Sequence, residues 1–299
     1  MSRDIPITYY LNWRVVSDEL IPLIMEQVAS YGIRNIVLTE SIIYRSNELD
    51  THEIFLKSAR SAGLVFVDSH APLLETDLLG LAPERNRKAM LRSAGNTIRL
   101  AAEFGCRTCT FHCWNWRPDT HCAEERFGFI CDSLEKLLPV AEENGVIIAL
   151  ENVWSPPCTA DMLVRIMKHF NSPWLGLCYD SGHAFLFDYG RKYPGKSCVP
   201  VSWTCPEAEI PWDNHTLEKM LPWLVNCHLH DNNGLTDQHL LPGAGLIDWK
   251  HIVNLLEQAP NLKCIQSEVI AKWQDGDVKT LKEKFEKIFS DESCVVSDS

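Results

Sequence analysis

The amino-acid sequence predicts a single-domain α/β protein, a (β/α)8 barrel of the TIM-barrel class. Eight short apolar segments recur along the 299 residues, and each is continuously apolar, as expected of strands buried on both faces of a parallel sheet. Most of the longer connections between these segments show the amphipathic period of a helix. Several connections end in a glycine just before the next strand, at Gly32, Gly63, Gly105 and Gly145. Eight such strand–helix units in one chain of this size indicate a closed barrel.

The predicted strands share an apolar interior and a polar last residue. In chain order they are Ile5–Asn12, Asn35–Glu40, Leu64–His70, Arg107–His112, Val146–Glu151, Leu175–Asp180, Val225–His230 and Leu262–Glu268. The clearest predicted helices are Glu19–Tyr31, Ala82–Phe104, Ala123–Asn144, Ala160–Phe170, Trp249–Gln258 and Asp277–Phe289. A doubly wound open sheet is the alternative arrangement, but such a sheet usually has fewer strands and a glycine-rich first turn, which this sequence lacks.

The barrel domain is expected to span residues 1–290, and the polar residues 291–299 are expected to form a disordered tail. One connection departs from the pattern of strand and helix. Residues 184–214 are rich in proline and show little helical periodicity, so only Thr216–Leu224 is predicted as a helix before the seventh strand. A long segment of this kind is either a lid over a binding site or an insertion that packs on the barrel rim, and the sequence leaves both readings open.

Charge and cysteine content limit the classes of partner and compartment. The chain has 28 Lys and Arg against 40 Asp and Glu, a formal net charge of −12, so no nucleic-acid partner is expected. Neither an apolar window of membrane-spanning length nor a signal-peptide core is present, so a cytoplasmic location without membrane contact is expected. The 12 cysteines are expected to be reduced, because several lie within apolar strands. Cys106 and Cys109 form a Cys-x-x-Cys pair without the second pair typical of structural zinc sites.

Six successive predicted strands, from the third to the eighth, end at or near side chains that bind metals. These side chains are His70, His112, Glu151, Asp180, His183, His228, Asp237, His239 and Glu268. Because the active site of such a barrel forms at the C-terminal ends of its strands, all nine side chains are expected to face one concave site there, called the cup below. Burying four carboxylates together would be costly without cations, so the sequence predicts one to three divalent metal ions. Imidazole-rich ligation favours zinc, manganese or iron over magnesium, and zinc or manganese is expected.

These segments resemble the xylose-isomerase-like barrels, a family that contains sugar and sugar-phosphate isomerases and epimerases together with endonuclease IV. The matching segments are Asp68–His70, Phe111–His112, Leu150–Asn152, Cys178–His183, His228–Asp231, Asp237–His239, Pro242–Gly245, Ile247–Trp249 and Ser267–Glu268. The resemblance implies that the ligand positions of single-metal epimerases are matched by Glu151, Asp180, His228 and Glu268. The three-zinc nuclease adds positions matched by His70, His112, His183, Asp237 and His239. Since all these residues are present, the ligand set alone does not separate the two activities.

Two features favour a small polar substrate over a DNA duplex. The chain is strongly acidic, and the segment Cys113–Trp116 departs from the His-Pro-Gly pattern that resemblance to the nuclease implies. The expected activity is therefore a metal-dependent sugar or sugar-phosphate isomerase or epimerase that transfers a proton through an enediolate. An endonuclease IV-like phosphodiesterase is the alternative, and a non-enzymatic barrel that binds a metabolite is a third reading. The expected partner is a small-molecule sugar, and the sequence leaves open whether the chain forms a homo-oligomer.

Glu151 and Glu268 are the predicted pair of catalytic base and acid, because they approach the cup from opposite sides. The predicted substrate contacts are His183, His112, Trp114, Trp154 and His230. The tryptophans follow strands that carry ligands, and they either stack against a sugar or pack the rim. His230 is expected to share a strand face with His228, in an outer-shell, substrate-binding or packing role.

Two acidic residues are expected to organise the loop after the seventh strand, which is polar and contains several glycines. Asp231, at the start of the loop, is predicted to cap or orient it. Asp248, at its end, is predicted to be the N-cap of the helix that begins at Trp249. The sequence thus predicts a strand–loop–helix unit that carries ligands in its loop.

Overall fold

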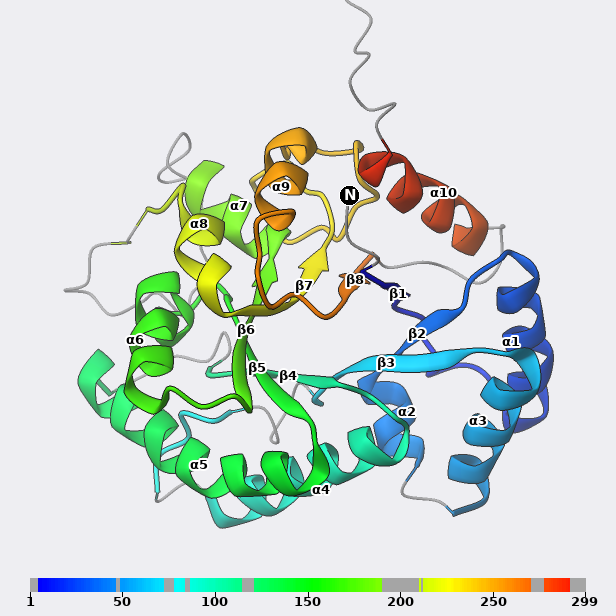
Figure 1. Ribbon diagram of the computed structural model, residues 1–299, viewed down its shortest axis with the longest axis horizontal. Coiled ribbons are helices and arrows are strands. Elements are labelled where there is room, and N and C mark those ends of the chain that lie inside the picture. The colour runs from blue at the N-terminus through cyan, green and yellow to red at the C-terminus, as the bar shows by residue number, and fades with distance from the viewer. Residues whose placement is uncertain are drawn as a thin grey trace, which may run out of the picture.

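The computed structural model describes residues 5–46, 49–72, 78–83, 87–114, 121–189, 210, 212–269 and 277–290. Within these residues, eight parallel strands close into a barrel in chain order, and the last strand pairs with the first (Figure 1). The strands are β1 (Ile7–Tyr9), β2 (Asn35–Leu38), β3 (Val65–His70), β4 (Thr108–His112), β5 (Ile147–Glu151), β6 (Leu175–Asp180), β7 (Leu224–Leu229) and β8 (Ile265–Ser267). The predicted single-domain (β/α)8 barrel is therefore confirmed.

Helices pack around the outside of the barrel and connect successive strands (Figure 1). They are α1 (Ile21–Ser30), α2 (Glu40–Arg45), α3 (Leu49–Ala62), α4 (Arg87–Glu103), α5 (Ala123–Asn144), α6 (Ala160–Phe170), α7 (Ser181–Tyr189), α8 (Thr216–Met220), α9 (Trp249–Leu256) and α10 (Asp277–Phe289). Short 3-10 turns lie at Asp18–Leu20, Pro156–Cys158 and Leu221–Trp223. The helices α5, α6 and α10 begin and end at the predicted residues.

The strands are placed as predicted, but several are shorter than the apolar segments. The predicted strand Ile5–Asn12 keeps only three residues, as β1. Glu40, predicted to end the second strand, is instead the first residue of α2. His230 and Glu268 lie directly after β7 and β8 rather than inside them. Apolar segments predict where a strand lies, whereas backbone pairing with its neighbours decides where it ends.

The start of the connection between the sixth and seventh strands was predicted wrongly. Residues from Ala184 onward were expected to lack helical structure, but α7 continues through Tyr189. This helix is apolar on most of its surface, with Ala184, Leu186 and Phe187 buried, so it shows no amphipathic period. Residues 190–209 and 211 lie outside the described part of the chain. The lid and the rim-packing readings therefore both stay predictions.

Two further expectations concern the ends of elements. The predicted helix Thr216–Leu224 is shorter than expected, because α8 ends at Met220 and a 3-10 turn follows. That turn contains Pro222, which lacks the amide proton that a continuing helix would need. The predicted tail, residues 291–299, lies outside the described residues, so the domain boundary at 290 stays a prediction.

The cysteines predicted to lie in strands contribute to the core of the barrel. Cys109, Cys178 and Cys227 lie in β4, β6 and β7, Cys264 directly precedes β8, and all four are buried. Each described cysteine is a free thiol, as expected for reduced cysteines. Among the described residues, no helix combines the length and the apolar composition that a membrane span requires.

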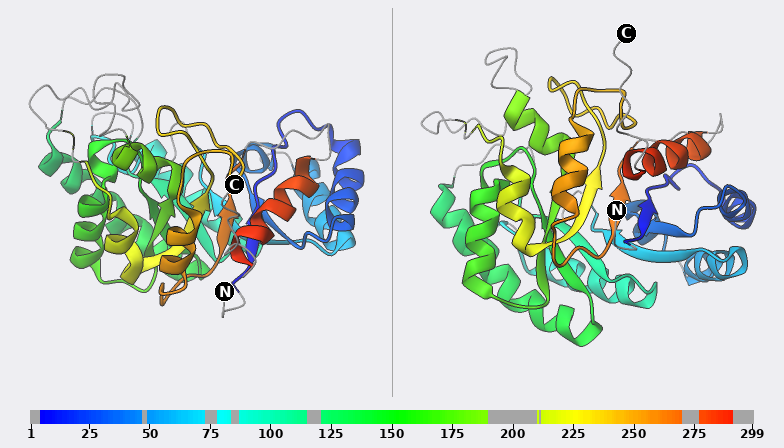
Figure 2. Two further views of the ribbon diagram at one scale, coloured as in Figure 1. Left: turned by 90° about the horizontal axis from the view of Figure 1, so that it is seen from above. Right: turned by 45° about the horizontal axis from the view of Figure 1, so that its top comes forward.

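The loop between β7 and α9 rises above the C-terminal ends of the strands, on the side away from the start of β1 (Figure 2). Asp231 holds this loop in place, because it directly follows β7 and its carboxylate accepts four hydrogen bonds. The donors are the backbone amides of Asn232, Gly243 and Ile247 and the indole of Trp249, at 2.9, 2.9, 3.1 and 2.9 Å. Asp248 caps α9 by accepting a 3.1 Å hydrogen bond from the amide of His251. Both acidic residues therefore act as the sequence predicts.

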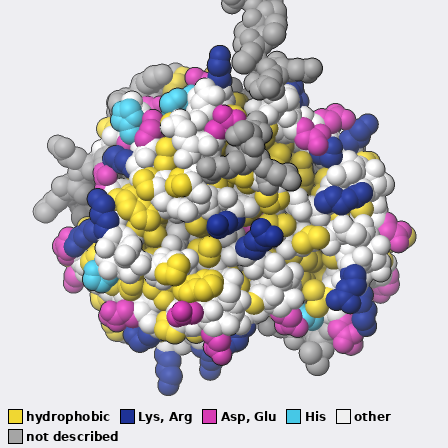
Figure 3. Space-filling model, viewed as in Figure 1, with side chains coloured by type: hydrophobic (Ala, Val, Ile, Leu, Met, Phe, Trp, Pro, Cys, Tyr) yellow, Lys and Arg dark blue, Asp and Glu magenta, His cyan; other side chains and the backbone are white. Residues whose placement is uncertain are grey.

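The opposite face of the barrel, at the N-terminal ends of the strands, faces the viewer in Figure 3. Basic and acidic side chains are scattered over this face without a continuous patch of either sign (Figure 3). The predicted ligand residues belong to the other end of the barrel, where the strands end.

Candidate metal centre

The predicted ligand side chains converge at the C-terminal ends of the strands. His70, His112, Glu151 and Asp180 are the last residues of β3, β4, β5 and β6, His228 lies in β7, and Glu268 directly follows β8. His183 lies in the first turn of α7, and Asp237 and His239 lie in the loop after β7. Together with His230, these residues form overlapping groups in which the ligand atoms lie within 4.8 Å of one another, and three of these groups between them include every one of the residues.

The first group consists of Glu151, Asp180, His228 and Glu268. His228 Nδ1 lies 3.2 Å from Glu151 Oε2 and 3.1 Å from Glu268 Oε2. Glu151, Asp180 and His228 are fully buried, and 14% of the Glu268 side chain is exposed. Three carboxylates around one imidazole in a buried place repel one another, so this donor set fits a divalent cation.

Unsatisfied polar atoms in the first group support this fit. Glu151 Oε1, His228 Nδ1 and Glu268 Oε2 are buried, and their contacts at 3.1–3.3 Å with charged neighbours are ion pairs that lack the geometry of a hydrogen bond to a described residue. A buried polar atom without a partner costs roughly 1–3 kcal/mol. A cation held between these side chains would satisfy all three atoms at once, so the residues present suit a bound metal.

The second group consists of His70, His112 and Glu151. The Nε2 atoms of His70 and His112 lie 3.4 and 3.1 Å from Glu151 Oε2, so Glu151 is shared between the first and second groups. His70 Nδ1 donates a 2.7 Å hydrogen bond to the carbonyl of Ala71. A carbonyl oxygen can only accept, so Nδ1 carries a proton, and Nε2 is the atom that faces Glu151 and is placed to bind a metal.

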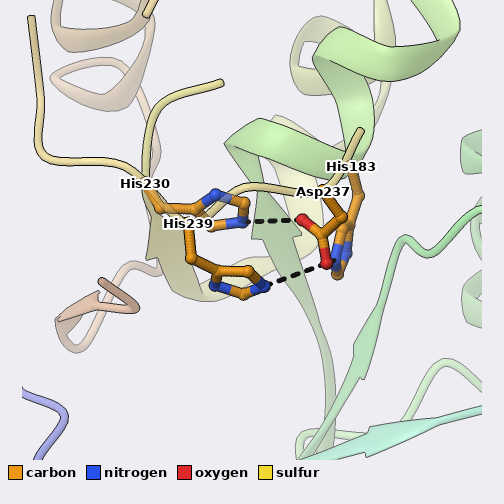
Figure 4. A group of neighbouring side chains, drawn as sticks. All are labelled: His183, His230, Asp237 and His239. Atoms are coloured by element: carbon orange, nitrogen blue, oxygen red, sulfur yellow. Dashed lines mark hydrogen bonds and ion pairs between the residues drawn. The ribbon is translucent and has the colours of Figure 1, made fainter. Parts of the chain in front are cut away.

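The third group consists of His183, His230, Asp237 and His239, which point toward one another in Figure 4. His239 Nε2 lies 3.0 Å from Asp237 Oδ2, and His183 Nε2 lies 3.7 Å from the same oxygen. His230 Nε2 lies 3.8 Å from Asp237 Oδ1. The resemblance implied only three of these residues as ligands, so the structure adds His230 to the group.

Asn152, directly after β5, positions the end of β6 against the first group. Its side chain accepts a 2.8 Å hydrogen bond from the amide of Asp180 and donates a 3.0 Å bond to the carbonyl of the same residue. The backbone carbonyl of Asn152 accepts a 3.0 Å hydrogen bond from His183 Nδ1. One residue therefore fixes ligands in two groups, as outer-shell partners do in metal sites.

The imidazoles and carboxylates shift one another's pKa. Burial favours the neutral form of Glu151, but His228 and His112 hold the pKa of Glu151 well below its usual range. Burial lowers the pKa of His70, but hydrogen bonding and charge from Glu151 outweigh it and raise the pKa to about 9. Since a metal binds neutral imidazole, a cation that binds here displaces protons from the histidines.

The two predicted tryptophan contacts differ in their surroundings. Trp154 meets His183 edge to face, with ring centroids 4.5 Å apart, and so lies beside the third group. Trp114 is 1% exposed, and the guanidinium of Arg126 lies 3.7 Å from its ring centroid. Trp114 therefore contributes to packing, and its contact with a substrate stays a prediction. Residues 115–120 after it lie outside the described part of the chain.

Sequence reasoning did not select the polar residues at the ends of β1 and β2. Tyr10 directly follows β1, and its hydroxyl donates a 2.7 Å hydrogen bond to Glu40 Oε2. Arg14 donates a 3.2 Å hydrogen bond to Glu40 Oε1. Burial raises the pKa of Tyr10, and the charges of Glu40 and Glu268 raise it further. Glu40 is the polar last residue of the second apolar segment. From this feature of the sequence, the ends of these two strands could have been predicted to contribute to the same site.

The comparison with protein families identifies the group to which this barrel belongs. A sequence model of the xylose isomerase-like TIM barrels matches residues 25–277. The chain belongs to this family. The match covers most of the described barrel and confirms the resemblance drawn from the ligand segments.

Individual relatives and solved structures resemble this chain in sequence or in fold. The protein y4fM of Sinorhizobium fredii is 29% identical over 167 residues, which cover 54% of this chain and 46% of the relative, so the match spans about half of that protein. The crystal structure of a D-tagatose 3-epimerase-like protein has a TM-score of 0.70 at 20% identity and covers 94% of this chain and 96% of its own. The IolI protein with a bound zinc atom has a TM-score of 0.66 at 17% identity, with coverages of 95% and 99%. At these identities the solved structures show a shared fold.

Proposed function

We propose that the protein is a metal-dependent isomerase or epimerase of sugars or sugar phosphates that transfers a proton through an enediolate. The observation that carries this proposal is the convergence of Glu151 and Glu268 on His228 Nδ1, at 3.2 and 3.1 Å. Two carboxylates from separate strands reach one point in the cup, which suits removal of a proton and its return to a neighbouring atom or the opposite face. The name of the D-tagatose 3-epimerase-like protein supports the same class of reaction.

The first group is proposed to hold the ion that takes part in the reaction. When bound there, a divalent cation supplies Lewis-acid stabilisation for negative charge that develops on substrate oxygens. Glu151 and Glu268 hold and move the proton, and Glu151 Oε1 suits this role because it forms no hydrogen bond with a described residue. His112 and His183 line the same cup, and if only one ion is bound, His183 or His112 is proposed to contact a substrate oxygen.

In addition to His230, the three groups together supply five imidazoles, alongside their carboxylates. We therefore propose zinc or manganese as the metal. The zinc bound by the IolI protein supports zinc as one choice. The three groups allow one to three ions, and Glu151, which belongs to two of the groups, would help to hold the ion in either.

A phosphodiesterase is the second candidate, and one observation favours it. Three groups of ligands in one cup exceed what a single-metal proton transfer requires, whereas clustered ions suit the activation of water and the clamping of a phosphate. The formal charge of −12 argues against a long nucleic acid as the substrate, so we rank this candidate second.

An isotope experiment separates the two candidates. The purified protein, supplied with zinc or manganese, is incubated in D₂O with ketoses, aldoses and their phosphates. The isomerase or epimerase incorporates deuterium into a sugar carbon, because a proton held on a carboxylate can exchange before its return. A phosphodiesterase introduces no carbon-bound deuterium. Cleavage of an abasic duplex or a simple phosphodiester, with neither sugar turnover nor deuterium incorporation, would reverse the ranking.

A further inference from the structure

The third group differs from the first in the number of imidazoles that it brings together. His183, His230 and His239 surround the single carboxylate of Asp237, and their ligand atoms lie within 4.8 Å of one another (Figure 4). Three imidazoles and one carboxylate are four protein ligands. A zinc ion takes four ligands in a tetrahedron, and a site in which the protein supplies all of them is the structural kind. The first group also has four side chains, but three of them are carboxylates, which suit ions such as manganese that take further ligands in an octahedral site.

Hydrogen bonds orient two of the imidazoles for this purpose. His183 Nδ1 donates to the carbonyl of Asn152 at 3.0 Å, and His239 Nδ1 donates to the carbonyl of Glu268 at 2.6 Å. Since a carbonyl only accepts, Nδ1 of both rings carries a proton, and Nε2 is the atom that faces Asp237 and binds a metal once it has lost its own proton. Asp237 Oδ1 is buried and forms no hydrogen bond with any residue in the described ranges.

The imidazole of His230, the third in the group, is held in a closely packed position. The ring is fully buried and packs against Gly182, where an added Cβ would lie 2.0 Å from His230 Cε1. Ser181 holds the backbone of His230 by accepting from its amide at 3.0 Å and donating to its carbonyl at 2.8 Å. The rings of His230 and His239 are stacked 3.9 Å apart at 12°, which brings both Nε2 atoms to the same side of Asp237.

His230 also has a competing explanation. Its Nε2 lies 3.1 Å from both carboxylate oxygens of Asp180, so it could serve only to orient Asp180 in the first group. That role would leave three ligands in the third group and an open position on its metal. The two explanations differ in which ion is lost when His230 is replaced.

We propose that the third group holds a zinc ion of its own, with His230 as the fourth protein ligand and no position open to substrate. This ion links the loop after β7 to α7. The ion of the first group is then the one that contacts substrate. The inference rests on the proposed metal dependence but not on the identity of the reaction.

Metal content tests the proposal independently of any activity. Zinc per chain is measured after dialysis against a weak chelator, and the coordination number is read from the visible absorption of the cobalt-substituted protein. We expect one tightly held, tetrahedral ion in the native protein. His230→Asn and Asp237→Asn should each remove it, with a loss of affinity beyond the roughly 10–100-fold that an outer-shell partner costs. His215→Asn, at a largely exposed histidine outside the groups, is the matched control and should retain it.

Glu268→Gln distinguishes this ion from the one in the first group. It should weaken the first ion and leave the tetrahedral one in place. The proposal is overturned if His230→Asn keeps the tight ion while Asp237→Asn loses it, because His230 then serves Asp180 alone. A native cobalt protein without a tetrahedral spectrum also overturns it, even if His230→Asn fails to fold. Absence of sugar turnover would count against the proposed function and leave this result unaffected.

Discussion

His239 donates a 2.6 Å hydrogen bond from Nδ1 to the backbone carbonyl oxygen of Glu268. The carboxylate of Glu268 belongs to the first ligand group and the imidazole of His239 to the third, so this bond connects the two groups directly. His239 has a φ of 49°, in the left-handed region that a residue other than glycine rarely adopts. Such a conformation costs about 1–3 kcal/mol and persists where the surroundings fix it, commonly at functional sites. The position of His239 therefore depends on the end of β8.

Replacement of Glu151 or Glu268 by glutamine should separate proton transfer from metal binding. Glutamine keeps the size and one oxygen for a metal but removes the basic carboxylate. We expect turnover to fall by at least about 10²-fold, the usual scale of general acid–base catalysis, while metal affinity falls only in part. Sugar turnover and metal titration are measured on the same preparations. Glu124→Gln, at an exposed ion pair with Arg165, is the control, and an equal loss of turnover there would contradict the assignment.

Asp231→Asn should destabilise the loop that carries Asp237 and His239. The carboxylate accepts four hydrogen bonds from the loop and from Trp249, whereas an asparagine places an amide donor where two of these donors point. Hydrogen bonds to a charged group contribute roughly 1.5–3 kcal/mol each, so we expect the unfolding free energy to fall by at least about 2 kcal/mol. Urea unfolding measures this change.

Asp248→Asn is the matched control for that experiment, because it lies at the other end of the same loop. Asp248 caps α9, and asparagine is as good an N-cap as aspartate. We expect its unfolding free energy to change by less than about 0.5 kcal/mol. Equal losses in the two variants would mean that Asp231 does not hold the loop in the way described.

Most of the barrel could be predicted from the sequence because strands buried on both faces are continuously apolar. β6 was predicted to the residue, and a polar side chain at each strand end indicated the cup. α7 was missed because a helix that is apolar on most of its surface has no amphipathic period.

The sequence predicted which residues belong to the ligand set more completely than it predicted which of them lie together in each group. Strand ends can be read from the sequence, so His70 and Glu151 could be expected in one cup. The role of His230 depends on how its ring packs on Gly182 and His239, and that packing depends on a left-handed residue in a loop. Contacts of this kind are set by tertiary structure and leave no periodic signal in the sequence.

The net charge of −12 predicts weak binding to a DNA duplex. A protein that neutralises many phosphates loses affinity steeply as salt rises, with a slope of about −0.9 per phosphate contact. We expect fluorescence anisotropy with an abasic duplex to show weak binding and a slope shallower than that of a multi-phosphate contact. Tight binding at ordinary salt with a steep slope would favour the phosphodiesterase instead. A duplex without the abasic site is the control for non-specific binding.

Asp68 should make the stability of the metal-free protein depend on pH. It is fully buried in β3, two residues before His70, and burial raises the pKa of its carboxyl from 3.8 to about 6, although His228 opposes the shift. The folded state thus prefers the neutral acid. This contribution to stability is complete below pH 3.8 and is lost as the pH rises through about 6. Asp68→Asn keeps an oxygen acceptor for the side-chain amide of Asn226 and has no proton to lose.

The expected result is a pH-dependent difference between this variant and the native chain. Relative to the native protein, Asp68→Asn should gain unfolding free energy between pH 4 and pH 7, by up to about 3 kcal/mol, and the gain should level off above the folded-state pKa. Urea unfolding at a series of pH values, with chelator present throughout, measures it. Asp132→Asn, at a half-exposed carboxylate, is the control and should show no such rise. A difference that stays constant with pH would show that the carboxyl of Asp68 is already ionised in the folded protein.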